Sequence, residues 1–185
     1  MTRRLQPERM RYAAEVWGYK ADYNAEYAIG GFEVLGPTAS NAIPELTRLM
    51  SSASRIVASR AIHALIKIGT NGLAPVIGTL TNETCPLDLR CDVAYTLGLD
   101  RPNAARVIDV LVYCLEDRRT PIPLRRALLS ALRVMGDGAS NAIPLMVRML
   151  NAPEYSVRYD VTNALQSIAP PEVLETNGIP PSPFE

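Results

Sequence analysis

Residues that could carry out chemistry are few in this chain. His63 is its single histidine, so a serine or cysteine nucleophile activated by an imidazole base would have to use it. Its neighbours Ile62, Ala64 and Leu65 follow a helical apolar pattern, which favours a structural or surface role for His63. The sequence contains no Walker phosphate-binding loop and no HExxH or GxSxG motif. We therefore expect no catalytic residues.

The three cysteines do not form a recognisable metal-binding pattern. Cys85 and Cys91 are six residues apart, and Cys114 is remote from both. Structural zinc takes four Cys or His ligands, commonly in closely spaced pairs, so we expect neither a metal nor a cofactor. Cys114 lies in the apolar segment VYCL and is predicted to be a core residue. An odd number of unpatterned cysteines favours a reducing, cytoplasmic setting.

The charge balance argues against nucleic acid as the partner. Lys and Arg total 19, and Asp and Glu also total 19, whereas proteins that bind phosphate backbones usually carry a basic surplus. The first residues, MTRRLQPERM, lack the apolar run of a secretory signal. No stretch approaches the roughly 18 apolar residues of a membrane span, so no membrane association is expected.

An internal repeat dominates the sequence. The segments GPTASNAIPELTRLM, from residue 36, and GDGASNAIPLMVRML, from residue 136, share ASNAIP and lie 100 residues apart. This separation corresponds to three periods of about 33 residues. A second recurring segment follows each copy of the first. Each copy of this second segment has an apolar residue near its end, namely Leu65, Leu97, Leu132 or Leu165. The chain is therefore predicted to consist of repeated two-segment units.

Both recurring segments have helical periodicity. Val157, Val161, Leu165 and Ile168 are spaced by four, four and three residues, so they share one helix face. Alternation at period two is absent, which excludes strands from the prediction. We expect an all-α fold, an α–α superhelix or solenoid of antiparallel helix pairs.

Glycines, capping residues and prolines predict where these helices begin and end. Gly36, Gly69, Gly98 and Gly136 follow the apolar stripes, where helices often end in a left-handed residue. Ser40 with Asn41, and Ser140 with Asn141, are predicted N-caps. Pro44 and Pro144 then fall in the first helical turn, where proline is tolerated.

The pattern AIPxLxxxL, followed by a short loop and then [VL]RxxxxxAL, resembles the short HEAT-like repeats named after phycobilisome lyases, which are common in bacterial proteins. The resemblance covers roughly residues 31–168. It implies helix pairs at about 36–69, 70–98, 99–136 and 137–168. Residues 1–35 would form a divergent capping helix or partial repeat, and residues 169–185 a Pro-rich tail.

The resemblance also implies a ladder of polar side chains along the array. Such repeats typically stack an acidic or amide residue of the inter-helix turn with an arginine early in the second helix. The turn residues here would be Glu83, Asp117 and Asn151, and the arginines Arg90, Arg125 and Arg158. The first pair departs from the pattern because Ala58 stands at the arginine position.

Arrays of this kind present an elongated concave surface made by successive second helices. Removing the core stripe from those helices leaves nine candidate protein-binding residues: Ser59, His63, Tyr95, Arg126, Ser130, Arg133, Tyr159, Asn163 and Gln166. This mixed surface favours a protein or peptide partner, and hence a scaffold or adaptor. Two alternatives come from the resemblance: a DNA glycosylase-type protein with a basic groove, and a bilin lyase-like subunit.

Both termini differ in composition from the repeats. Tyr12, Trp17, Tyr19, Tyr23, Tyr27 and Phe32 are concentrated near the start of the chain. They would either cap the open end of the stack or form a docking surface. The tail from Ala169 contains five prolines. It is predicted to be an extended cap, a linker or a polyproline-type ligand rather than a continuation of the helices.

Overall fold

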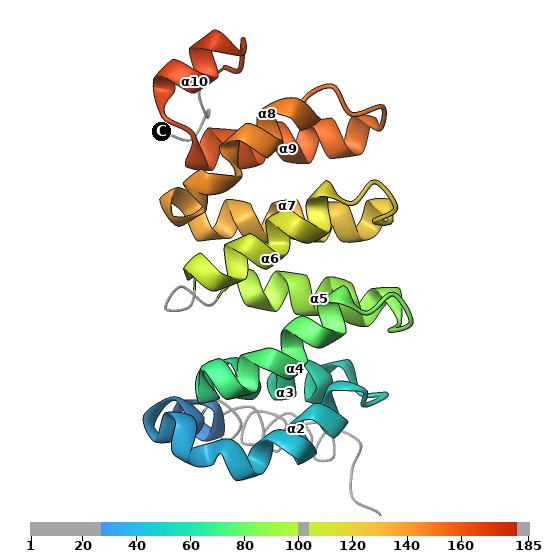
Figure 1. Ribbon diagram of the computed structural model, residues 1–185, viewed down its shortest axis with the longest axis vertical. Helices are drawn as coiled ribbons and strands as arrows, with labels where there is room; N and C mark the ends of the chain where they lie inside the picture. Colours follow the sequence, from blue (N-terminus) through green and yellow to red (C-terminus); the bar gives the residue numbers. More distant parts are fainter. Residues whose placement is uncertain (1–26, 100–103, 181–185) are drawn as a thin grey trace, which may run out of the picture.

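The computed structural model describes residues 27–99 and 104–180. These residues contain helices and turns but no strand, which confirms the predicted all-α class. Figure 1 shows the helices arranged as pairs stacked one after another along the long axis of the molecule, with α2 near one end and α10 at the other.

Each pair consists of a first helix, a short turn and a second helix. The first helices are α2 (Ile43–Met50), α4 (Thr70–Thr81), α6 (Ala104–Glu116) and α8 (Ile143–Met149). The second helices are α3 (Arg55–Ile68), α5 (Leu87–Gly98), α7 (Ile122–Met135) and α9 (Tyr155–Ile168). Second helices pack against each other in sequence, α3 on α5, α5 on α7 and α7 on α9. Residues 27–35 are helical and precede the first pair.

The predicted helix starts are partly confirmed. Pro44 and Pro144 do fall in the first turns of α2 and α8. The predicted N-caps are wrong. The chain enters α2 through the 3₁₀ helix η1 (Gly36–Ala42) and α8 through the 3₁₀ helix η3 (Gly136–Ala142). The 3₁₀ turns supply carbonyl acceptors for N–H groups at the junctions, such as Ser40 O for the N–H of Ile43, so no side-chain cap is needed.

The predicted helix ends are also partly confirmed. Gly69 and Gly136 have φ of +92° and +59° and follow α3 and α7, as expected for residues that a side chain would strain. Gly98 is different because it lies inside α5 and is buried. An added Cβ there would lie 2.6 Å from the Cα of Ala131. Gly98 therefore permits close packing of α5 on α7.

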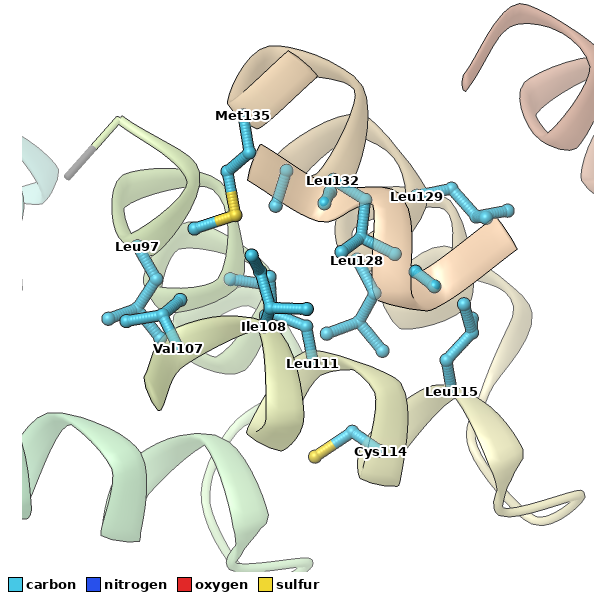
Figure 2. Close-up of a cluster of buried hydrophobic side chains, with 14 of the residues drawn as sticks. Leu97, Val107, Ile108, Leu111, Cys114, Leu115, Leu128, Leu129, Leu132 and Met135 are labelled. Atoms are coloured by element: carbon cyan, nitrogen blue, oxygen red, sulfur yellow. The ribbon is translucent and has the colours of Figure 1, made fainter. Parts of the chain in front are cut away.

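The core runs continuously through the stack. The four late apolar leucines of the sequence pattern, Leu65, Leu97, Leu132 and Leu165, are fully buried. In Figure 2, Ile108 and Leu111 of α6 extend toward Leu128 and Leu132 of α7, with Leu97 of α5 beside them. Cys114 is buried in the same cluster, which confirms its prediction as a core residue. Each second helix thus contributes to the core of its own pair and of the next.

The arginines of the predicted ladder donate hydrogen bonds to carbonyl groups, and Arg125 also lies 4.0 Å from the carboxylate of Glu154. They span the turn of their own pair: Arg90 Nε donates to Leu80 O at 2.9 Å, Arg125 Nη2 to Arg118 O at 2.6 Å and Arg158 Nη1 to Ala152 O at 2.7 Å. Carbonyls at a helix end or in a turn have no helical partner, and these guanidinium groups supply one. Among the described residues, no ion pair joins Arg90 to Glu83 or Arg125 to Asp117, so these two pairs of the predicted ladder are not formed.

A different arginine links the acidic residues of neighbouring turns. Arg119 Nη2 lies 3.0 Å from Asp117 Oδ2 and 3.5 Å from Glu83 Oε1. The hydrogen bond from Arg119 holds the pKa of Asp117 below its usual value. The charged residues of the turns of the second and third pairs are thus joined through Arg119.

The C-terminal tail is more ordered than predicted. Residues Pro171–Thr176 form the short helix α10, which is possible because proline is tolerated at a helix start. Leu174 and Ile179 are buried against the core, so this segment covers the end of the stack beyond α9 (Figure 1). Of the N-terminal aromatic residues, only Tyr27 and Phe32 lie within the described residues.

Candidate protein-binding surface

The outward-facing side chains of α3, α5, α7 and α9 form what we call the second-helix surface. Tyr95 on α5 and Tyr159 on α9 are 51% and 55% exposed, although both are large aromatic residues. Arg126 and Arg133 on α7 are exposed as well. The remaining candidates, Ser59, His63, Ser130, Asn163 and Gln166, are half-buried. Because the four second helices pack side by side in sequence order, the nine candidates lie on neighbouring helices.

Two ion pairs cross this surface between neighbouring helices. Arg126 Nε on α7 donates to Asp160 Oδ2 on α9 at 2.6 Å. Arg55 Nε on α3 donates to Asp92 Oδ2 on α5 at 3.0 Å. In both pairs a carboxylate offsets the positive charge of the arginine. This compensation lowers the positive potential that a nucleic-acid groove would need.

Two of the nine candidates form side-chain hydrogen bonds to backbone groups of the chain itself. His63 Nδ1 lies 3.0 Å from Ser59 O, one turn earlier in α3, so the imidazole is tied to its own helix. Gln166 Nε2 donates to Pro180 O at 2.7 Å, which attaches the tail to α9.

The structure adds exposed apolar residues that are not among the nine candidates. Ile56 on α3, Ile122 on α7 and Tyr155 on α9 are exposed, Tyr155 to 73%. Tyr155 lies one turn before Tyr159, so the two rings share a helix face. The Arg158 guanidinium lies 5.7 Å from the centroid of the Tyr155 ring. Ile56, Ile122 and Tyr155 lie in the first turns of α3, α7 and α9, before the candidates Ser59, Arg126 and Tyr159. Extending the candidate set to these first turns would have found them.

The thiols of Cys91 and Cys114 do not have the environment of reactive cysteines. Burial raises the pKa of Cys91 and of Cys114, so the thiolate, which is the nucleophile and metal ligand, is disfavoured at neutral pH. Within residues 27–99 and 104–180, no group of three His, Cys, Asp or Glu side chains is arranged to hold a metal ion. None of the described helices is long and apolar enough to cross a membrane.

Comparisons with known proteins bear on the fold alone. No protein-family model matches the chain, and no curated protein matches it. Among solved structures, the chain is similar to the crystal structure of an engineered protein, a target of the Northeast Structural Genomics Consortium. That match has a TM-score of 0.50 and 18% sequence identity, and it covers 83% of this chain and 78% of the other. Together with the stacked pairs, it defines the class of the molecule as an all-helical repeat fold.

Proposed function

We propose that the protein is a HEAT-like α-solenoid scaffold that binds a protein or peptide partner on the second-helix surface. The exposure of Tyr95 and Tyr159 is the observation that carries the proposal. Large aromatic residues bury apolar area at small conformational cost and are common anchors of protein interfaces. Their position on α5 and α9 spreads the surface over several pairs, as extended recognition by a helical array requires.

The second-helix surface combines aromatic and positively charged side chains, which supports a partner with both apolar and acidic groups. Tyr95, Tyr155 and Tyr159 supply aromatic area, and the exposed guanidinium of Arg133 supplies hydrogen-bond donors. Two of the other arginines, Arg55 and Arg126, are paired with aspartates. A protein surface or extended peptide with apolar and acidic groups would complement this arrangement. Three free cysteines in the described chain agree with a cytoplasmic location.

The proposal is tested by capturing partners from the native organism with the whole chain and then measuring the affinity of the captured protein. Tyr95→Ala and Tyr159→Ala are the test variants. Truncation of an interface anchor costs about 2 kcal/mol or more, which corresponds to roughly 30-fold weaker binding. We expect at least one of the two variants to weaken binding to this extent.

Val34→Ala is the control because Val34 is 88% exposed but lies in the helical residues 27–35, outside the second-helix surface. It should leave the affinity unchanged. If Val34→Ala weakens binding while Tyr95→Ala and Tyr159→Ala do not, the partner uses another surface and the proposal is wrong.

A further inference from the structure

Arg90, near the start of α5, combines deep burial with incomplete hydrogen bonding. Only 7% of its surface is exposed. Its Nε donates to Leu80 O at 2.9 Å, whereas neither terminal nitrogen, Nη1 or Nη2, has a hydrogen-bond partner among the described residues. A buried guanidinium with unused donors is costly unless an acceptor reaches it. The site therefore calls for an external acceptor.

The equivalent arginines of the next two pairs make different contacts. Arg125 also has a buried donor without a partner, its Nε, but its Nη1 lies 4.0 Å from Glu154 Oε2. Arg125 and Arg158 each use a terminal nitrogen to bind a turn carbonyl, at 2.6 and 2.7 Å respectively. Arg90 uses Nε for the same task, and this leaves the outer edge of its guanidinium unoccupied. The difference distinguishes the turn of the second pair from those of the third and fourth.

Arg90 lines a pocket of about 290 Å³ between the turns of the second and third pairs. We call it the turn pocket. Its other walls include Thr81, Tyr113, Cys114 and Thr120. Neither Nη1 nor Nη2 is a fully enclosed atom, so both are accessible to water or to a ligand. The volume of the turn pocket is close to the lower limit for ligand-binding pockets, roughly 300 Å³, so the pocket can hold a small chemical group.

The charges around the turn pocket select the kind of anion. Glu83 and Asp117 line it but are both engaged by Arg119. No ion pair joins Arg90 to a described carboxylate, so its guanidinium is available to a single negative charge. Two guanidinium groups and two carboxylates line the pocket in all, and their formal charges sum to zero. A dianionic phosphate would experience the repulsion of two nearby carboxylates. A planar carboxylate also matches two parallel donors of a guanidinium.

We propose that the turn pocket is a binding site for one carboxylate, held by a bidentate contact from Nη1 and Nη2 of Arg90. The carboxylate belongs to a small acid or to the side chain of an acidic residue in a peptide. This site lies at the turns and includes none of the nine candidates of the second-helix surface, so it does not depend on the proposed scaffold function.

The test is a titration of the ¹⁵N-labelled whole chain followed by NMR of the arginine side-chain Nε–H signals. Sodium acetate is added in exchange for sodium chloride at constant ionic strength. We expect a saturable shift of the Arg90 signal with a dissociation constant in roughly the millimolar range, as for one charge-assisted bidentate contact. Acetamide, the neutral isostere, should cause no such shift.

Two further probes distinguish the possible sources of the carboxylate. N-acetylglutamate α-methylamide presents the acid as a peptide side chain, with N-acetylglutamine α-methylamide as its neutral control. Tighter binding of the glutamate probe than of acetate indicates a peptide ligand, and tighter binding of acetate indicates a free small acid. Either result supports the proposal. Tighter binding of inorganic phosphate than of both carboxylates would contradict it.

Arg90→Lys retains the charge but loses the bidentate edge, so it should weaken acetate binding by at least about tenfold. Arg125→Lys is the matched control and should leave acetate binding unchanged, because Arg125 does not line the turn pocket. The wild-type titration decides the matter even if the Arg90 variant fails to fold. An Arg90 signal that is unmoved by 100 mM acetate, or a lysine variant that binds as tightly as the wild type, would overturn the proposal.

Discussion

Arg126 on α7 binds Asp160 on α9, with Nε of the arginine 2.6 Å from Oδ2 of the aspartate. The same kind of pair joins Arg55 on α3 to Asp92 on α5. In each case the aspartate side chain is mostly buried and the arginine side chain is mostly exposed. The arginines thus lie across the junction between successive helix pairs, and they also belong to the surface proposed to bind a partner.

The Arg126–Asp160 pair is expected to stabilise the array only slightly. Because half of the Arg126 side chain is exposed, solvent and salt screen the attraction, and exposed pairs contribute about 0.2–1 kcal/mol. A double-mutant cycle with Arg126→Ala and Asp160→Asn, measured by urea unfolding, should give a coupling free energy in that range. The coupling should fall further in 1 M NaCl. A coupling above about 2 kcal/mol would show that the pair is a main structural contact.

The two aspartates are also expected to limit binding to nucleic acid. The wild-type chain should bind duplex DNA only weakly at physiological salt, since its net charge is zero and Arg55 and Arg126 are paired. Replacing both Asp92 and Asp160 with Asn should increase the affinity and steepen its dependence on salt. Fluorescence anisotropy with a labelled duplex measures both effects. Sub-micromolar binding by the wild type would instead favour the DNA-binding alternative.

Gly98 and Gly78 are expected to respond to alanine with opposite signs. In Gly98→Ala the new Cβ would lie 2.6 Å from the Cα of Ala131, and α5 and α7 would have to separate, at a cost of roughly 1–3 kcal/mol. At Gly78 in α4, nothing lies within 4 Å of the added Cβ. Gly78→Ala should therefore stabilise the chain by about 0.5–1 kcal/mol through helix propensity. Urea unfolding of both variants tests the pair, and a stabilising Gly98→Ala would contradict the close packing of α5 on α7.

The sequence predicted the features that depend on periodicity. Leu97 and Leu132 lie at corresponding points of an apolar helical stripe, and the structure buries both completely. The predicted first-turn positions of Pro44 and Pro144 are confirmed for the same reason, because they depend on local backbone geometry. The spacing of apolar residues and prolines along the chain was therefore enough to predict the helices and the face of each helix that lies against the core.

Features that depend on contacts between segments could not be predicted in this way. Arg90, Arg125 and Arg158 align in sequence, yet Arg90 binds its carbonyl through Nε and the other two through terminal nitrogens. Ser140 was predicted to be an N-cap, but η3 supplies the junction with backbone acceptors. The sequence also gave no sign that residues 174 and 179 would be buried against the core. These outcomes follow from the positions of turns in space, which spacing along the chain does not determine.

Leu132→Ala is expected to destabilise the array strongly. Leu132 is fully buried on α7, in the cluster shared with α5 and α6 (Figure 2). Emptying a core leucine site typically costs about 2–5 kcal/mol. Leu35→Ala is the control because Leu35 is exposed, and it should change the free energy of unfolding by less than about 0.5 kcal/mol. Chemical denaturation measures both, and a loss below about 1 kcal/mol for Leu132→Ala would place that residue outside the core.

Tyr95→Ala and Tyr159→Ala separate a binding role from a packing role for the second-helix surface. Because about half of each ring is exposed, truncation removes only part of the apolar contact that a buried aromatic residue makes. We expect each variant to lower the melting temperature by no more than about 2 °C. Leu132→Ala, measured under the same conditions, should lower it by at least about 4 °C.

The alternative is that the two tyrosines cover the junctions between helix pairs, since amphipathic side chains often lie over apolar surface. In that case each truncation would lower the melting temperature by several degrees and leave the affinity for a captured partner unchanged. The scaffold proposal requires the reverse combination, a small change in melting temperature with a large loss of affinity. Because the two measurements respond to different contacts of the same rings, together they show whether Tyr95 and Tyr159 support the array or bind its partner.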